Sequence, residues 1–245
     1  MRPTVEIAAL LLLVAAPAMG GAGVSLRWFS CFPDTASRWN RSFACDTNVG
    51  AERVVGSFQI GQIMPEVTGN EIVVDLHTGR PWSGSSTPLP EWWRFRNAGS
   101  CRASALAVAL IQNPELEPCP DWSAGQAVGG IGAYVVGIAG PGTARIIMAS
   151  AVPQASAAFL TPDVEYFSFT LIIRHDKTVG TEACAGCEVP MTLILNSVNV
   201  TTPVPAEHRR YSGPVNGTDS NYVVWSPTPV PTRRSTWGAV KSLYH

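Results

Sequence analysis

Apolar and polar residues alternate along most of this chain with a period of two, which is typical of β-strands that bury one face. The segment Val24–Trp28 alternates in this way, and residues 53–60 and 71–76 are short runs rich in β-branched residues beside glycine. Residues 164–174 give the strongest signal, because every second side chain from Phe167 is apolar. We expect this segment to be a central, buried strand whose apolar face consists of Phe167, Phe169, Leu171 and Ile173.

Further strands follow from the same pattern. Residues 134–138 and 143–152 flank an Ala-Gly-Pro-Gly turn, so they are expected to form a hairpin. Residues 191–200 are another apolar-rich run. The segment 103–111 is rich in alanine, which suits a helix. Its larger apolar residues alternate with alanine, however, and an Asn-Pro pair ends the run early, which favours a strand.

These segments amount to eight or nine strands, and no long amphipathic helix separates them. They predict an all-β fold, an antiparallel β-sandwich or jelly roll, because an α/β fold needs helices between its strands. We expect the sandwich domain to span residues 19–200. Residues 201–235 should be a proline-rich extended segment with a candidate edge strand at 222–225, and residues 236–245 a short tail.

Residues 1–18 have the pattern of a secretory signal peptide. An apolar run at 7–16 follows Arg2, and Ala16-Pro17-Ala18 provides the small residues that signal peptidase recognises. The run is shorter than the roughly 20 residues that a membrane-spanning helix needs. We therefore expect export, and no transmembrane segment after the signal peptide is cleaved.

Six cysteines support the prediction of export, because an even number in an exported chain is typical of a disulfide framework. Their spacing favours three local pairs: Cys31–Cys45, Cys101–Cys119 and Cys184–Cys187. The last pair is expected to close a hairpin between the strands at 164–174 and 191–200. Sequence spacing does not exclude the other connectivities.

The Cys184-Ala185-Gly186-Cys187 motif has two alternative interpretations. A C-x-x-C pair can be a redox dithiol, but no βαβ unit surrounds this one. It can also supply half of a zinc site, but His175 and His208 lack the spacing of zinc ligands. A structural disulfide is favoured, and we predict no metal and no cofactor.

Charge and composition narrow the classes of partner. Lys and Arg number 17 against 18 Asp and Glu, charged residues make up 14% of the chain, and no basic stretch stands out. Because binding to phosphates needs clustered Lys and Arg, nucleic acid is not expected as a partner. Hydrophobic residues make up 46%, which is enough to form a buried core and argues against a globally disordered chain.

One aromatic group is a candidate binding surface for glycans. Trp82, Trp92 and Trp93 could form a flat platform for sugar rings, and Glu91 and Arg94 could bind the hydroxyl groups. Part of the group lies in a loop rich in Ser, Gly and Pro, where binding surfaces are common. The favoured alternative is structural: Trp92 and Trp93 straddle a strand, with one ring in the core and the other over a sheet edge.

No catalytic motif is present. A glycoside hydrolase needs two carboxylates at a set separation. Candidate acids are scattered along the chain: Asp75, Glu91, Asp121, Asp163 and Glu165. No G-x-S-x-G motif occurs, and His77, His175 and His208 have no recognisable partner motif. We predict no catalytic residue, and we interpret His175-Asp176 as a strand end and turn.

The C-terminal residues carry a resemblance. Thr236-Trp237-Gly238, Lys241 and Leu243-Tyr244 form the pattern TWGxxKxLY. This pattern resembles the C-terminal tails of uncharacterised secreted proteins of environmental bacteria. The resemblance implies a bacterial host and export, and it transfers no activity, ligand or residue role. In the tail itself, an apolar helical face too short to be stable alone should dock on its own domain or on a partner.

Together these patterns predict an exported, non-enzymatic structural or interaction module of the cell surface or extracellular space, with a protein or glycan partner. The first alternative is a carbohydrate-binding module that uses the aromatic platform. The second is a secreted hydrolase or thiol oxidoreductase.

Overall fold

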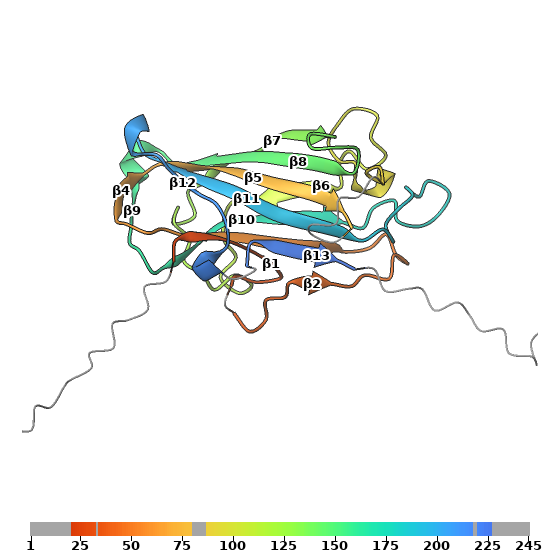
Figure 1. Ribbon diagram of the computed structural model, residues 1–245, viewed down its shortest axis with the longest axis horizontal. Coiled ribbons are helices and arrows are strands. Elements are labelled where there is room, and N and C mark those ends of the chain that lie inside the picture. The colour runs from red at the N-terminus through yellow and green to blue at the C-terminus, as the bar shows by residue number, and fades with distance from the viewer. Residues whose placement is uncertain (1–20, 33, 80–86, 218–219, 227–245) are drawn as a thin grey trace, which may run out of the picture.

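The computed structural model describes residues 21–32, 34–79, 87–217 and 220–226. Within them the chain forms an antiparallel β-sandwich with two main sheets (Figure 1). One sheet has the strand order β1 (Gly23–Trp28), β3 (Ala51–Gln59), β10 (Glu165–Arg174) and β6 (Leu106–Ala109). The main path of the other is β2 (Asn40–Arg41), β13 (Tyr222–Trp225), β11 (Met191–Thr201), β5 (Gly69–Thr78), β8 (Thr143–Ala151) and β7 (Val128–Val136).

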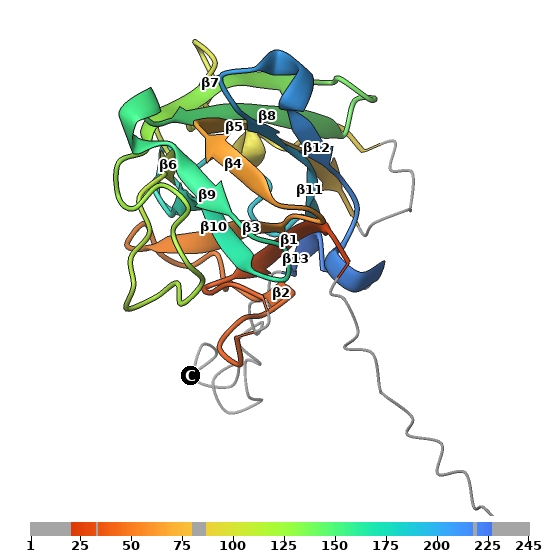
Figure 2. The ribbon, with the colours of Figure 1, turned by 90° about the vertical axis from the view of Figure 1, so that its left-hand side faces the viewer.

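Short elements complete the described fold. A further strand, β12 (Arg209–Tyr211), pairs with β11. β4 (Met64–Val67) pairs with β9 (Ala158–Leu160) at the end of the sandwich that faces the viewer in Figure 2. Four single-turn 3-10 helices lie in loops: η1 (Glu91–Trp93), η2 (Gln154–Ser156), η3 (Pro205–Glu207) and η4 (Val215–Gly217). The pairing of β2 with β13 is parallel, and the other pairings between described strands are antiparallel.

The core lies between the two main sheets, as the alternating pattern predicts. In β1, Val24, Leu26 and Trp28 are buried and belong to the main core cluster. In β11, Met191, Leu193 and Leu195 belong to the same cluster. Every second side chain of each strand therefore points into one shared core. The all-β sandwich class is confirmed.

β10 is the central strand that the sequence predicts, but its apolar face is not continuous. The register with β3 shifts between Phe167 and Phe169, which marks a β-bulge. Phe169, Leu171 and Ile173 lie in the main core, whereas Phe167 packs in a separate cluster with the cysteines of one disulfide. The prediction of one face for all four residues is wrong for Phe167, because the extra residue of a bulge reverses the alternation.

The expected hairpin between β10 and β11 is also absent. β10 belongs to the four-stranded sheet and β11 to the larger one, so residues 175–190 cross from one sheet to the other. Proximity in sequence favours a hairpin. In a sandwich, however, a connection between consecutive strands can equally pass between the layers.

The sandwich extends beyond the expected boundary at residue 200. β12 and β13 both pair with β11, so the segment after 200 contributes strands to the larger sheet. The candidate strand at 222–225 is present as β13, but its expected place at the edge of the sheet is wrong, because β2 pairs with its outer side. The signal peptide and the C-terminal tail lie outside the described residues. Within the described ranges, no helix is long and apolar enough to cross a membrane.

Candidate interaction surface

Three disulfides connect distant parts of the chain. Cys31 bonds to Cys119, Cys45 to Cys187 and Cys101 to Cys184, over sequence separations of 88, 142 and 83 residues. All six cysteines are oxidised as expected, but each of the three expected local pairs is wrong. The fold brings loops from different parts of the chain together at each bond. Sequence spacing alone could not reveal those contacts.

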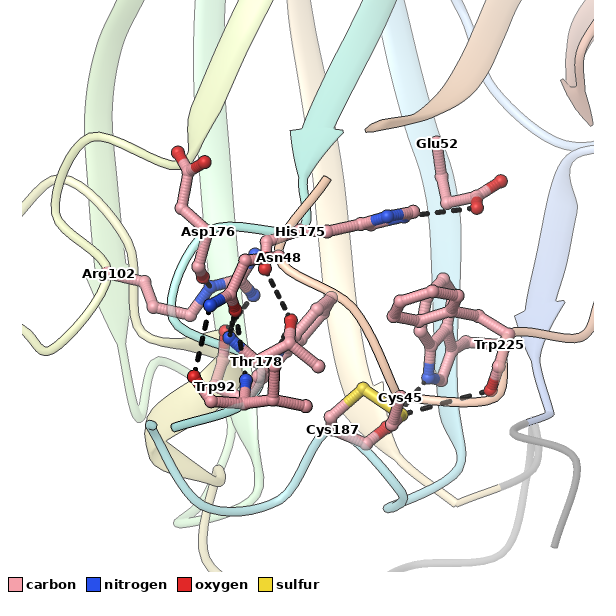
Figure 3. Close-up of a disulfide and its surroundings, with 12 residues drawn as sticks. Cys45, Asn48, Glu52, Trp92, Arg102, His175, Asp176, Thr178, Cys187 and Trp225 are labelled. Carbon is pink, nitrogen blue, oxygen red and sulfur yellow. Dashed lines mark hydrogen bonds and ion pairs between the residues drawn. A yellow bond between two sulfur atoms is a disulfide. The ribbon is translucent and has the colours of Figure 1, made fainter. Parts of the chain in front are cut away.

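The two cysteines of the C-x-x-C motif do not bond to each other. Cys184 and Cys187 are each 3% exposed and are bound to different loops. Figure 3 shows the Cys45–Cys187 bond beside Trp225, whose indole N–H donates to the carbonyl oxygen of Cys187 at 2.9 Å. A redox dithiol needs two thiols that can bond to one another, so this motif is structural.

The tryptophan pair lies in the core. Trp92 and Trp93 are fully buried, and they lie on η1 and not on a strand. Their ring centres are 5.3 and 5.4 Å from that of Trp225. Neither ring can stack on a sugar, so the platform is wrong for this pair, and so is the placement of one ring over a sheet edge. Glu91 and Arg94 are exposed beside them, and Trp82 lies outside the described residues.

A buried ion pair network joins three elements near the Cys45–Cys187 bond. Arg41 donates from two guanidinium nitrogens to Glu52, whose side chain is 2% exposed. His175 Nε2 lies 3.1 Å from the same carboxylate, and its Nδ1 lies 2.8 Å from the carbonyl oxygen of Val49 (Figure 3). The imidazole also stacks on Phe43 with ring centres 3.9 Å apart. Both ring nitrogens of His175 therefore have a hydrogen-bond partner, and the contacts anchor the turn that the sequence predicts at His175.

The candidate acids have separate structural roles. Asp75 accepts two hydrogen bonds from Arg145, at 2.7 and 2.9 Å. Asp121 caps its own turn by accepting from the N–H groups of Ser123 and Gly125. These hydrogen bonds give Asp75 and Asp121 a structural role in the sheet and in a turn, respectively.

Two of the candidate acids do share a hollow. Asp163 and Glu165 line a depression of about 570 Å³ beside the Cys31–Cys119 bond, together with Asp34, which the sequence does not single out. Burial raises the pKa of Glu165 to about 7, while hydrogen bonds from Ser57 and the backbone of Phe32 oppose that rise. The group therefore titrates near neutral pH. In the described residues, no group of three or more His, Cys, Asp or Glu could hold a metal ion.

A different region has the features of an interaction surface. Residues 122–144 contain no charged side chain, and they include the whole of β7. β7 is the last strand of its sheet, and β8 is its one strand partner in the described fold. On the outer face of β7 and β8, large apolar side chains remain exposed: Val128 68%, Val135 38% and Ile147 40%. Alanines 149 and 151 are exposed on the same face.

An apolar groove adjoins the beginning of β7. It has a volume of about 430 Å³ and is lined by residues 108–111, at the end of β6, and by residues 127–129. Ile111 is 54% exposed there. β6 and β7 are the edge strands of the two main sheets and lie close together, so the groove lies where these two sheet edges meet.

The sequence analysis did not single out this surface. The feature of the sequence that could have indicated this surface is the stretch 122–144, which contains no charged residue. Such a stretch can equally be core. What distinguishes it is the edge position of β7, which depends on the order of strands in the sheet. We define the uncharged surface as the edge and outer face of β7, the outer face of β8 from Ile147 to Ala151, and the adjoining groove. Arg145, which pairs with Val135 on the same face of the sheet, bounds this surface.

The sequence matches no protein-family model and no curated protein. Among solved structures, the chain is similar to the second type II cohesin module from the cellulosomal adaptor ScaA scaffoldin of Acetivibrio cellulolyticus, with 8% sequence identity and a TM-score of 0.30. The alignment covers 85% of this chain and 94% of that one. These values are too low to transfer any property of that module to this chain.

Proposed function

We propose that this chain is an exported, non-enzymatic interaction module that binds a protein partner through the uncharged surface. The observation that carries the proposal is an edge strand of nine residues without charge, next to an exposed apolar face. Soluble proteins commonly protect such edges with charged side chains or proline. Exposed contiguous apolar patches typically mark sites of protein or membrane interaction.

The disulfides support the location in this proposal. Three long-range bonds join the loops of the sandwich, and such bonds persist in oxidising compartments. The signal-peptide pattern at residues 1–18 and the tail resemblance add a bacterial surface or extracellular location. The tail would then connect the module to its site of action.

Site-specific photo-crosslinking tests the proposal. A photoreactive residue replaces Ile147, which is 40% exposed on the uncharged surface, and in a matched variant it replaces Ile63, which is 56% exposed elsewhere. Each purified protein is illuminated with the secreted and surface fractions of the cells that produce it. We expect protein adducts from position 147 and not from position 63. Equal adduct formation at both positions, or none at position 147, contradicts the proposal.

A further inference from the structure

β7 has β8 as its one strand partner in the described residues, so no described strand pairs with its other edge, although β6 lies close to β7. Both Figure 1 and Figure 2 show β7 at the rim of the sandwich, with β8 on its inner side. The strand is nine residues long, which corresponds to about 30 Å of backbone. An edge of this kind presents unpaired N–H and C=O groups to a second strand.

Two hydrogen bonds show which residues face this edge. The N–H of Gly137 donates to the carbonyl oxygen of Thr143, the first residue of β8. The backbone N–H and C=O groups of Tyr134 and Val136, which are in the alternate positions, therefore point away from β8. Arg96 donates to the carbonyl oxygen of Ile131 at 3.4 Å from outside the strand, so Ile131 and Gly129 also face away. The residues that point to the free edge are odd-numbered in the first half of β7 and even-numbered in the second half, because the β-bulge between Ile131 and Ala133 adds one residue between them.

The two halves of β7 are complementary in size. The first half is Val128-Gly129-Gly130-Ile131, and the second is Ala133-Tyr134-Val135-Val136. We consider two copies of β7 paired antiparallel along their free edges. In one register, the residues whose backbone groups point to the free edge lie opposite one another. The same register places a glycine opposite each valine of the second half. In that register Gly129 lies opposite Val136, Gly130 opposite Val135 and Ile131 opposite Tyr134.

We propose that the partner of this surface is a second copy of the chain, paired β7 to β7 about a twofold axis in this register. This inference rests on the proposed function and names its partner. The dimer joins the two larger sheets into one continuous sheet. Because the interface is isologous, each contact occurs twice.

The groove supplies a second point of contact. Gly129 lines the groove, and it lies opposite the partner's Val136 in the proposed register. Val136 is 37% exposed in the single chain, and Ile138, just beyond it, is 45% exposed. The twofold axis therefore places the exposed apolar end of each β7 against the apolar groove of the other copy. Both ends of the interface bury surface that is otherwise in water.

Charge is compatible with this pairing except at one position. No charged side chain lies on β7, so the proposed register brings no like charges directly opposite one another. Arg96 is the exception, because it reaches the edge at Ile131, close to the proposed axis. The Arg96 guanidinium groups of the two copies would approach each other there. Each must also leave the carbonyl oxygen of Ile131, because in the dimer that oxygen faces the other copy. The structure thus predicts a reversible dimer and not a permanent one.

Paired charge substitutions test the register. A Cβ atom added at Gly130 would meet no other atom within 4 Å, and Val135 is 38% exposed, so both positions accept larger polar residues. The variants are G130K/V135K and G130E/V135E, and the control is V49K/I63K at positions 80% and 56% exposed elsewhere. Thermal melting establishes that each variant is folded. Native mass spectrometry over a hundredfold dilution series measures the dimer.

We expect concentration-dependent dimers of the wild type and the control, and monomers of each charged double variant, since like charges meet at Gly130 and Val135. An equimolar mixture of the two double variants should form a heterodimer. A wild type that is monomeric throughout overturns this inference, while the photo-crosslinking at Ile147 still decides the proposed function. Dimeric double variants, or a mixture without heterodimer, overturn the proposed register.

Discussion

The guanidinium carbon of Arg102 lies 3.5 Å from the centre of the Trp92 ring, and both side chains are buried in the sandwich. The guanidinium donates to three carbonyl oxygens, those of Trp92, Arg174 and Asp176. It therefore ties η1 to the end of β10. This contact explains why the tryptophan pair is part of the core and is not a binding platform.

Replacing Arg102 by lysine should destabilise the fold. A lysine ammonium is compact and cannot match the planar fork that reaches three separate carbonyl groups. Buried acceptors left without a donor cost about 1–3 kcal/mol each. We expect Arg102→Lys to lower the free energy of unfolding by at least about 2 kcal/mol in urea denaturation. Arg174→Lys, at an exposed position, is the control and should change it little. Equal stability of the two variants would contradict this role.

The disulfide connectivity makes a prediction about paired serine substitutions. C184S/C187S breaks two long-range disulfides, whereas C31S/C119S breaks one. Loss of a native disulfide typically costs about 2–5 kcal/mol. We therefore expect C184S/C187S to be the less stable variant by thermal melting and to have two free thiols by mass spectrometry. The local pairing Cys184–Cys187 predicts the opposite order of stability and no free thiol.

The raised pKa of Glu165 makes stability depend on pH. The pKa is about 7 in the folded chain against an ordinary value of 4.5, so between these values the folded state holds a proton that the unfolded state has lost. Stability should fall as pH rises through this window, by at most about 3 kcal/mol. Glu165→Gln removes the charge, so the variant should match the wild type near pH 4 and exceed it near pH 8. Glu71→Gln, on an exposed side chain, should follow the wild type at both values.

The contact of Arg96 with the β7 edge predicts how dimerisation responds to salt. Repulsion between two guanidinium groups near the axis is screened by ions. The wild-type dimer should therefore be tighter in 500 mM salt than in 50 mM salt, two test conditions chosen to span the screening range. Arg96 has a φ of +62°, which asparagine also tolerates. Arg96→Asn should tighten the dimer roughly three- to tenfold at low salt, because a charge-pair effect of about 1 kcal/mol corresponds to this range. Weaker association of this variant would contradict the placement of Arg96 at the axis.

Deleting residues 236–245 should change assembly or location more than folding. The last strand of the described residues, β13, ends at Trp225 and pairs with β11. We expect an unchanged melting temperature for the truncated chain and an altered distribution between cell surface and medium. A truncated chain that fails to fold would show that the tail belongs to the core.

The period-two pattern by itself determined the fold class and the position of most strands. Alternation of buried and exposed residues is a local property, so β1, β5 and β11 lie where their sequences predict them. The even number of cysteines likewise predicted that all six are oxidised. These properties depend on neighbours in the chain and need no knowledge of the layers.

Tertiary structure alone decided which elements meet. The partner of Cys184 is Cys101 and not Cys187, because the crossing between sheets brings two distant loops together. Trp92 is in the core because Arg102 and Trp225 close around it. The exposure of the uncharged stretch in β7 follows from its place at the end of a sheet. Each of these outcomes depends on contacts between residues far apart in sequence, and a periodic pattern carries no information about such contacts.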